Sequence, residues 1–569
     1  MFKKIYKKFT ICFFLLILVF NSLLSAQLEI NKYYFNNKNR LLWVYIKPHN
    51  QNQLKPIRYS NTAKKRLKQA GWENNITDFA LPLDAVQSVA SIVDSVRHCS
   101  RSLRAISVSA NYQQYRKLLK QNFVKTIAPV AIYKRPTIDL NTKDKRLAKT
   151  TQYGYSLTQL KQINIPKLHE LGFTGKGVRI ALLDAGFNKN HEAFQKIINE
   201  NRLIAERDFI FGDNNVTNQN QEDSVWHQDS HGTSVWSLIG AYRPGKMIGG
   251  AYNAKFILGK TEVIRSETRI EEDNYIAGVE WADSLGVDII SSSLGYRDFD
   301  GEFKYAYSDL DGKTVRTTQA LNWASKRGIL CVTAAGNEKH DFDDGGLVTP
   351  GDSPYAITVG AVDSSGQLAG FSSHGPTFDG RIKPDLCAMG VHTMVARSTP
   401  TQQNYSFGGG TSYATPLITA GCALLLEHFK SWSPRTLLSE LKEHSSLAEN
   451  PNNLRGWGIP DFFITFKKNQ IIPEPPAGTS ENTIVCAPNP ANNLVTFYFH
   501  NPQKVLNNSS ILQIYNINGE KIYSQDIQDY LPKWHLEDQY GQKVPTGIYF
   551  IRIKSQEGLS KYGKLSVIF

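Results

Sequence analysis

Four polar side chains set among small residues could together activate a serine hydroxyl: Asp184, His231, Asn337 and Ser412. A neutral hydroxyl is a poor nucleophile, and it needs a base within hydrogen-bond reach and a group that orients this base. It also needs donors for the oxyanion that forms during acyl transfer. The serine, histidine, carboxylate and amide supply each of these roles once. We therefore expect the four side chains to form one site for nucleophilic catalysis.

Each of the four also has an ordinary structural interpretation when it is taken alone. Asp184 ends an apolar run and could cap a turn, and His231 begins an apolar segment that predicts a helix. Ser412 follows a run of glycines and could cap a helix, and Asn337 could turn the chain after a strand. Only the presence of all four residues together favours a catalytic role over these structural interpretations.

The elements that must position these residues lie between residues 153 and 466. Short apolar runs alternate there with helical patterns, which predicts an α/β fold with a parallel sheet covered on both faces by helices. In such sheets, sites gather at the carboxyl ends of the strands. The predicted strands are 178–183, 255–259, 288–292, 329–333 and 356–359, and the predicted helices are 231–241, 274–285, 318–327 and 412–429.

This part of the chain resembles the subtilisin-like serine proteases of family S8, over residues 160–465. Three motifs carry the resemblance: Thr174–Asp184 around the aspartate, His231–Thr233 around the histidine and Gly410–Pro416 around the serine. The chain order Asp, His, Ser is also the subtilisin order. The resemblance implies a subtilisin-like fold and a secreted serine endopeptidase that hydrolyses peptide bonds through an acyl-enzyme intermediate.

The resemblance also implies a role for each residue. Ser412 corresponds to the nucleophile, His231 to the general base that then protonates the leaving amine, and Asp184 to the group that holds the imidazolium. Asn337 would donate to the oxyanion, beside the backbone N–H of Ser412. The segment 291–295 matches the family's substrate-binding strand, on which an extended peptide pairs its backbone with the enzyme's. The residues implied to bind substrate are Ser292, Leu294, Gly295, Ala335 and Gly336.

Two departures from the family pattern bear on the site. Ala185 stands where the family more often has Ser or Thr, which removes one possible hydrogen bond and leaves the triad intact. The segment 296–317 looks like an insertion after the binding strand. It could shape specificity or bind structural calcium, and the favoured alternative is an ordinary solvated loop. The segment contains Asp298, Asp300, Asp309 and Asp311. The chemistry itself requires no cofactor or catalytic metal, and no cysteine of the chain has metal-ligand spacing.

Residues 1–26 have the layout of a secretion signal peptide. A basic start is followed by the apolar run 9–20 and by the small-residue cleavage pattern Leu24-Ser25-Ala26. The alternative is a retained transmembrane helix, because the uncharged stretch 9–27 is nearly long enough to span a bilayer. The pattern favours export over anchoring.

Residues 27–150 are strongly basic, with 23 Lys and Arg against 7 Asp and Glu, whereas the chain beyond residue 150 carries a net charge of −6. In the proteases that this chain resembles, an inhibitory propeptide occupies this position in the sequence. The opposite net charges favour binding of residues 27–150 to the rest of the chain. The resemblance implies a small α+β propeptide that chaperones folding, occupies the cleft and is cut at roughly 135–152. The alternative is an ordinary additional domain.

The end of the chain predicts a linker and a separate all-β domain. Residues 467–483 are rich in proline and polar residues, and from 484 to 569 alternating strands around the Asn518-Gly519 turn predict a small β-sandwich. The motifs 488–490, 514–519, 545–549 and 564–568 resemble the C-terminal sorting domain of the type IX secretion system of Bacteroidetes-like bacteria. That implies outer-membrane export, followed by release or attachment at the cell surface. The alternative is a sandwich that binds carbohydrate or protein.

The charge distribution and hydropathy of the 569 residues limit which classes of partner are expected. The net charge of +14 comes from the N-terminal quarter alone, so a nucleic-acid partner is not expected. Beyond the signal peptide no stretch approaches about 18 apolar residues, so no stable membrane anchor is expected. The expected partners are protein or peptide substrates, the chain's own propeptide and the type IX secretion machinery. The alternatives are an inactive subtilisin-like scaffold or binding protein, and a maturation protease with one narrow target.

Overall fold

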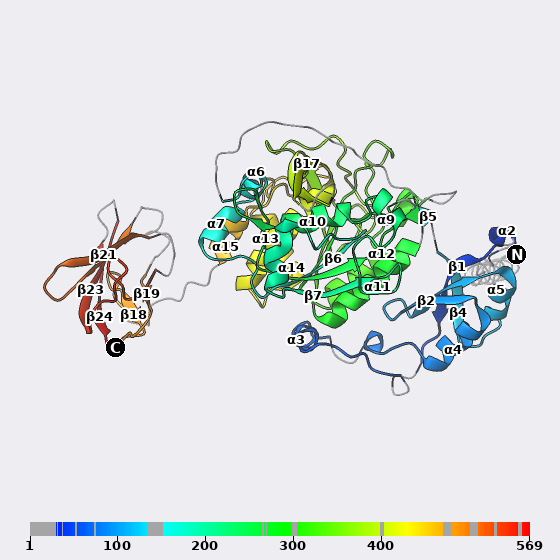
Figure 1. Cartoon of the computed structure of the whole chain (residues 1–569), viewed down its shortest axis with the longest axis horizontal. Helices are drawn as coiled ribbons and strands as arrows, with labels where there is room; N and C mark the ends of the chain where they lie inside the picture. The colour runs from blue at the N-terminus through cyan, green and yellow to red at the C-terminus, as the bar shows by residue number, and fades with distance from the viewer. Residues whose placement is uncertain are drawn as a thin grey trace, which may run out of the picture. The chain divides into compact units, whose positions relative to one another are not determined.

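The computed structural model describes residues 30, 32–36, 38–49, 51, 54–72, 75–130, 132–133, 152–264, 267–268, 270–298, 304–398, 403–469, 479–500, 510–527, 532–555 and 560–569. The chain forms two compact units, residues 1–466 and 467–569 (Figure 1). In the first unit we distinguish an N-terminal region, described between residues 30 and 133, and a central region, described between residues 152 and 466. The second unit is the C-terminal region.

A seven-stranded parallel sheet forms the middle of the central region, in the order β15-β14-β13-β12-β6-β10-β7. Most of its strands are continuous apolar runs, because both faces of the sheet are covered. The strands are β6 (Arg179–Asp184), β7 (Leu203–Asp208), β10 (Lys255–Lys260), β12 (Ile289–Ser292), β13 (Leu330–Ala334), β14 (Ile357–Val362) and β15 (Leu386–Met389).

Helices α10 (Ser230–Gly240) and α13 (Thr411–His428) pack on one face of this sheet, and α11 (Ile270–Leu285) and α12 (Arg316–Lys326) pack on the other. Successive strand side chains point to opposite faces, so Leu182 lies in the first apolar core and Leu183 in the second. The remaining elements are α6 (Leu157–Gln162), α7 (Ile165–Glu170), η3 (Glu192–Phe194), α8 (Gln195–Asn199), α9 (Gln221–Val225), β8 (Tyr242–Arg243), β9 (Met247–Ile248), β11 (Glu267–Thr268), η4 (Tyr307–Asp309), β16 (Thr393–Arg397), β17 (Asn404–Gly408), α14 (Pro434–Glu443) and α15 (Phe462–Asn469).

The N-terminal region has a four-stranded antiparallel sheet in the order β2-β3-β1-β4. One face packs with α4 and α5 in a core that includes Val44, Val89 and Leu118, whereas Trp43 and Ala105 join the apolar core of α11 and α12. This region thus sits on the outer side of those two helices. Its elements are α2 (Lys32–Phe35), β1 (Arg40–Ile46), α3 (Asn61–Gln69), η2 (Ile76–Asp78), α4 (Leu83–Ile92), β2 (Ser95–Ser100), β3 (Ala105–Ala110), α5 (Tyr112–Leu118), β4 (Val124–Pro129) and β5 (Ile132–Tyr133).

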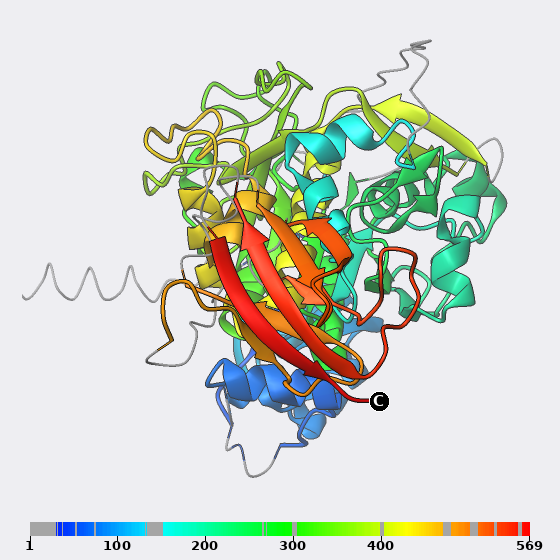
Figure 2. The ribbon, with the colours of Figure 1, turned by 90° about the vertical axis from the view of Figure 1, so that its left-hand side faces the viewer.

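The C-terminal region is a small β-sandwich, as the alternating pattern predicts (Figure 2). Two antiparallel sheets, β18-β19-β22 and β21-β20-β23-β24, enclose a core that includes Phe497, Ile514, Trp534 and Ile551. Its strands are β18 (Val485–Ala487), β19 (Val495–Tyr498), β20 (Ile511–Tyr515), β21 (Lys521–Asp526), β22 (Lys533–Trp534), β23 (Gly547–Lys554) and β24 (Ser560–Val567).

The structure confirms the predicted α/β sheet and shows where the sequence pattern falls short. All five predicted strands and all four predicted helices of the central region are present, with bounds shifted by a few residues. Strands β7 and β15 were not predicted. In the N-terminal region, the apolar residues of 86–96 have helical spacing, but α4 ends at Ile92 and Ser95 begins a strand that pairs with β3.

Candidate active site

Asp184 and His231 meet at the carboxyl end of β6. Asp184 is the last residue of this strand and is fully buried, and His231 is the second residue of α10. The Nδ1 atom of His231 lies 2.8 Å from Oδ1 and 3.0 Å from Oδ2 of Asp184. The backbone N–H of Ala185 donates to Oδ1 at 2.7 Å. The carboxylate therefore holds the ring through Nδ1, which leaves Nε2 as the atom that can exchange a proton with a substrate or nucleophile.

Gly232 allows α10 to approach the turn after β6 closely enough for this contact. A Cβ atom at position 232 would lie 2.2 Å from the carbonyl oxygen of Gly186 and 3.1 Å from Cβ of Asp184. The first distance is shorter than real Cβ contacts and involves a backbone atom, and the second is tighter than most such contacts. The glycine beside His231 is therefore a packing requirement of the Asp–His pair.

Ser412 lies at the beginning of α13, where it is 8% exposed. The preceding Gly410 has a φ of 144°, a conformation that L side chains rarely adopt, so the sharp approach to the helix requires glycine. The rings of His231 and Tyr413 are stacked with centroids 6.3 Å apart. The imidazole therefore lies beside the first turn of α13, whose positive dipole end favours negative charge.

Pro416 ties the nucleophile candidate to the neighbouring strand. Proline is common at the first helical position, where its missing N–H is spare, but this helix begins at Thr411, so Pro416 is its sixth residue. Its missing N–H frees the carbonyl oxygen of Ser412, four residues earlier. The hydroxyl of Ser293, just after β12, donates to that oxygen at 2.8 Å, and Ser412 Oγ donates to the Ser293 carbonyl oxygen at 3.2 Å. The two serines are thus joined in both directions.

Asn337 lies close to the same helix start. The backbone N–H of Thr411 donates to its Oδ1 at 2.9 Å, and the Thr411 hydroxyl donates to the same atom at 3.2 Å. With Oδ1 held in this way, Nδ2 is the amide atom that can donate to a substrate oxygen. The side-chain oxygen positions the loop of Ser412, and the nitrogen can serve an oxyanion.

Three neighbouring strands bring these residues together. Asp184 ends β6, Ser293 follows β12 and Asn337 follows β13, and these strands are adjacent in the order β13-β12-β6. Parallel strands place their carboxyl ends on one edge, so residues far apart in sequence meet there. The structure thus gathers Asp184, His231, Asn337 and Ser412 around one edge, where sequence analysis expects them.

A cavity of about 40 Å³ opens beside Ser412 and Asn337. Leu294, Gly295 and Gly336, three of the five residues implied to bind substrate, line it. The cavity is also lined by Glu262, Val263, Ile264, Glu271, Ser293, Ala334, Glu338, Val348 and Thr411.

Ser292 and Ala335 face elsewhere. Ser292 is fully buried as the last residue of β12, and Ala335 packs in a small core with Leu310 and Leu347. Because side chains alternate along an extended chain, the residues next to Ser292 and Ala335, Ser293 and Ala334, line the cavity instead. In each of the two segments, the cavity is thus lined by a neighbour of the residue that the resemblance implies, and the roles of Ser292 and Ala335 in substrate binding stay predictions.

Three carboxylates at the cavity escaped the sequence analysis: Glu262, Glu271 and Glu338. Burial raises the pKa of Glu338 to about 7, although the Asn337 N–H at 2.5 Å and the Ser373 hydroxyl at 3.3 Å favour its ionised form. Glu262 accepts a hydrogen bond from the Tyr296 hydroxyl at 2.6 Å. No signal in the sequence distinguishes these three from surface glutamates, because the folded sheet alone brings them together.

The predicted insertion after β12 is described for residues 296–298 and 304–317, so Asp300 lies outside the described residues. Asp298 pairs with Lys304, and Asp309 and Asp311 accept backbone N–H bonds within their own turns. Among the described residues no group of three or more His, Cys, Asp or Glu side chains is arranged to hold a metal ion. Cys331 and Cys422 are buried thiols, as their apolar surroundings in the sequence predict.

Comparison with known proteins identifies the central region. Residues 175–458 match the model of the subtilase family. Subtilisin E of Bacillus subtilis (strain 168) is 30% identical over 304 residues, which cover 53% of this chain and 68% of that protein. Subtilisin of Bacillus pumilus is 30% identical over 286 residues, covering 50% and 88%, and an alkaline protease of Shouchella clausii is 27% identical over 314 residues, covering 55% and 69%. The chain belongs to the subtilase family of serine-type endopeptidases.

The C-terminal region has its own match. Residues 486–567 match the model of a secretion system C-terminal sorting domain, which confirms the resemblance to type IX sorting domains. Such a domain directs the protein to secretion or to the cell surface. In the part of the chain that the structure describes, no helix is both long and apolar enough to cross a membrane.

Proposed function

We propose that the chain hydrolyses peptide bonds through a catalytic triad of Asp184, His231 and Ser412. The contact of His231 Nδ1 with both carboxylate oxygens of Asp184, beside the helix start that carries Ser412, is the observation that supports this most directly. In the first step Ser412 Oγ turns from the Ser293 carbonyl, gives its proton to His231 Nε2 and attacks the scissile carbonyl carbon. The C–O bond forms as the carbonyl π electrons move to oxygen.

The remaining steps use the same groups. Asn337 Nδ2 and the Ser412 backbone N–H donate to the oxyanion, at the positive end of the α13 dipole. His231 returns its proton to the leaving amine as the C–N bond breaks, and this gives the acyl-enzyme. Water then attacks the acyl carbon as His231 takes its proton; the C–O bond to Ser412 breaks, His231 returns the proton to Ser412 Oγ, and the acid product leaves. Asp184 holds the imidazolium in place but does not take up the proton.

The decisive test is labelling of the full chain by an active-site phosphonate, combined with hydrolysis of a mixed peptide library. Ser412→Ala should abolish both the label and the hydrolysis. Ser431→Ala, a change at an exposed serine of the same region, should leave both unchanged. A wild-type chain that folds and takes no label would instead support an inactive scaffold. Cleavage of a single sequence in the library would support a narrow maturation protease.

We further infer that the chain is made as a self-inhibited precursor. The N-terminal region packs on α11 and α12, and its last described strand, β5, pairs antiparallel with β11, a few residues beyond the cavity-lining Val263 and Ile264. A strand that pairs backbone to backbone in this way uses the same kind of contact as an extended peptide substrate. N-terminal sequencing of the exported protein tests this: the active form should begin after a cut at roughly 135–152, and residues 27–150 should be retained if the region is an ordinary domain.

Export would begin with the signal peptide 1–26 and end with the sorting domain in residues 484–569. Residues 1–26 lie outside the described residues, so this step rests on the sequence pattern. Deletion of 484–569 should cause the protein to accumulate in the periplasm. Normal export of the deleted chain would favour a carbohydrate- or protein-binding sandwich instead.

A further inference from the structure

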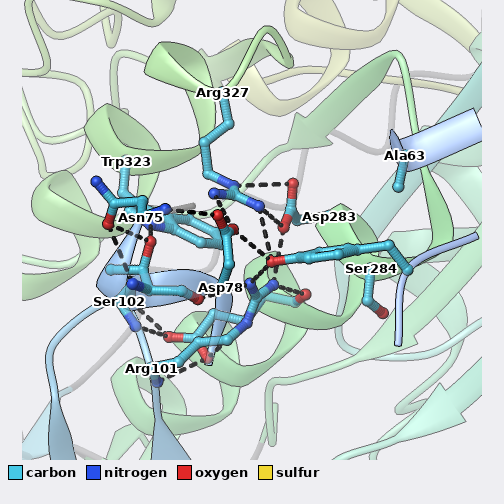
Figure 3. A network of polar contacts seen from close by, with 12 residues as sticks. Ala63, Asn75, Asp78, Arg101, Ser102, Asp283, Ser284, Trp323 and Arg327 are labelled. Atoms are coloured by element: carbon cyan, nitrogen blue, oxygen red, sulfur yellow. Dashed lines mark hydrogen bonds and ion pairs between the residues drawn. The ribbon is translucent and has the colours of Figure 1, made fainter. Parts of the chain in front are cut away.

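Two clusters of buried polar side chains lie at opposite ends of the central sheet. In one, Asp283 pairs with Arg66 of the N-terminal region. It also pairs with Arg101 and with Arg327, near the ends of α11 and α12 that precede the amino ends of β12 and β13 (Figure 3). The other cluster surrounds Gln228 at the carboxyl ends of the strands, close to the active site. Gln228 takes no part in the proposed steps of catalysis, so its contacts need an explanation of their own.

Gln228 lies between α9 and α10, three residues before His231, and its side chain is buried. Its backbone N–H donates to the Asp223 carbonyl at 2.9 Å. The preceding His227 has a φ of 50°, in the left-handed region that residues other than glycine seldom adopt. After this reversal of the chain Gln228 is 2% exposed, whereas Trp226 is 53% exposed. A local conformation of this kind persists when the surrounding contacts fix it.

The side-chain amide of Gln228 connects two parts of the site. Its Nε2 donates to the Ala185 carbonyl at 2.6 Å and to the Glu262 carbonyl at 2.5 Å. Its Oε1 accepts the Ile264 N–H at 3.0 Å. A flipped amide would place its oxygen against two carbonyl oxygens, so these partners fix its orientation. Only an amide side chain offers two donors and an acceptor without a charge, and glutamine therefore suits this place.

The Ala185 carbonyl belongs to the turn that holds the Asp–His pair. The Ala185 N–H donates to the Asp184 carboxylate at 2.7 Å, so one peptide group touches Asp184 and the next touches Gln228. The pairing of β6 with the chain of β10 ends here, with the hydrogen bond from the Thr261 N–H to the Asp184 carbonyl at 2.8 Å. Gln228 therefore bridges the two chains just beyond the end of their own pairing.

The other two partners of the amide belong to a wall of the cavity beside Ser412. Glu262 and Ile264 are the ends of a segment that follows β10, and we call residues 262–264 the cavity edge. Residues 293–295, which follow β12, line the same cavity, and β10 and β12 flank β6 in the sheet. Strand β11 begins three residues after Ile264 and pairs antiparallel with β5, so this part of the chain binds an extended segment through its backbone.

Side chains hold the cavity edge where the pairing with β6 has ended. The Val263 N–H donates to Glu271 Oε1 at 3.1 Å. The Glu262 carbonyl and the Ile264 N–H both bind Gln228, so two of these three hydrogen bonds come from one side chain. A buried carbonyl or N–H that loses its partner is costly, and the segment would shift to satisfy it. The position of the cavity edge therefore depends on the amide of Gln228.

We propose that Gln228 is a positioning residue that fixes the cavity edge relative to the Asp–His pair, and thereby supports binding of the substrate residues that lie several positions before the cut. The inference rests on the proposed peptidase function and adds a residue to substrate binding at the same site. The contact of His231 with Asp184 uses atoms that Gln228 does not touch, so it stays in place when the amide is lost. Gln228 thus acts on substrate binding and not on the chemical steps.

The test compares two substrates that share the residue before the cut and a chromogenic leaving group. The short substrate has only that residue, and the long one has five residues before the cut. Gln228→Met keeps a side chain of similar size but removes all three hydrogen bonds, and Gln221→Met, at an exposed position of α9, is the matched control. The active enzyme made from the full chain is used for every variant.

The expected effect depends on the length of the substrate. For Gln228→Met, kcat/KM for the long substrate should fall by roughly 5- to 25-fold, because each of the two hydrogen bonds to the cavity edge corresponds to roughly a fivefold change. The loss should appear in KM. Hydrolysis of the short substrate and the rate of labelling by the phosphonate should not change. Gln221→Met should match the wild type in all three measurements.

The outcomes separate this inference from the proposed function. If Gln228→Met loses activity equally towards both substrates, or towards neither, the positioning role is refuted although the enzyme is a peptidase. If the wild type takes no label and cuts neither substrate, the proposed function fails, and this inference fails with it. If Gln228→Met does not accumulate, Gln228→Asn decides, since its amide is one methylene group too short to hold both the Ala185 turn and the cavity edge. A several-fold loss confined to the long substrate supports the role, and any other result refutes it.

Discussion

Two titratable groups lie in the contact between the N-terminal and central regions, one in each region, and the shifts of their pKa values predict opposing pH effects on binding. His98 Nε2 lies 3.0 Å from Oδ1 of Asn274, and its ring packs against Phe209. Burial there lowers the pKa of His98 from 6.5 to about 4, which the Asn274 contact opposes only in part. Docking between these pH values therefore expels a proton, and binding weakens as the pH falls from 6.5 towards 4.

Asp273, in the first turn of α11, behaves in the opposite sense. Burial raises its pKa from 3.8 to about 7, although the Ser107 hydroxyl donates to it and Arg97 lies 3.7 Å away. Of the other nearby charges, Glu272 raises this pKa and Arg316 lowers it. Docking between pH 4 and 7 therefore takes up a proton, and binding weakens as the pH rises through this range.

The two effects overlap between about pH 4 and 6.5 and should nearly cancel. A single linked proton changes an affinity by at most about tenfold per pH unit. We expect a nearly flat profile for wild type in this range. Asp273→Asn should leave only the histidine effect, with binding weaker by up to about 300-fold on going from pH 6.5 to 4. His98→Gln should leave only the carboxyl effect, with the opposite slope.

The assay measures release of the cut N-terminal fragment from phosphonate-blocked enzyme between pH 4 and 7.5 at constant ionic strength. Asp84→Asn, at an exposed carboxylate of the same region, should reproduce the wild-type profile. Slopes of the same sign in Asp273→Asn and His98→Gln would refute the reasoning. So would a flat profile in both, because the burial of these two groups would then not depend on docking.

Three further outcomes follow from the site. Asn337→Asp keeps the acceptor for Thr411 but removes the donor, so kcat should fall by about 10²–10³, the range of a subtilisin oxyanion donor, with KM nearly unchanged in steady-state kinetics. Gly232→Ala should cost about 1–3 kcal/mol or more in thermal unfolding, because its Cβ meets backbone, whereas Gly370→Ala, in open space, should not. The pKa of Glu338 is about 7, so its side chain becomes negatively charged between pH 6 and 8. Over this range, the ratio of kcat/KM for a peptide with Lys before the cut to that for a peptide with Glu there should rise up to tenfold. Glu338→Gln should flatten this rise.

The sequence predicts the core of the sheet well, because buried parallel strands are visible as apolar runs. It misses the two edge strands, β7, of whose six residues only one is fully buried, and β15. The four candidate active-site residues, Asp184, His231, Asn337 and Ser412, are predictable because each lies in a short local motif. The cavity carboxylates and Arg66 are not, since their partners lie far along the chain: Arg66 and Asp283 are 217 positions apart. Helix α3 is rich in lysine and arginine, a pattern that predicts a solvated face. Arg66 is buried only because this helix docks on the central region.

Pro416 shows how a local rule and a long-range contact combine at the nucleophile. Proline this far into a helix normally destabilises it, because a carbonyl loses its partner and the ring crowds the preceding turn. Here the freed carbonyl belongs to Ser412 and receives the Ser293 hydroxyl at 2.8 Å, while Thr411 is held by Asn337 at 2.9 Å. The helix start is therefore fixed by residues that follow β12 and β13, and not by its own hydrogen bonds alone. Because β6 is adjacent to β12, the Asp184–His231 pair and the serine lie at one edge of the same sheet.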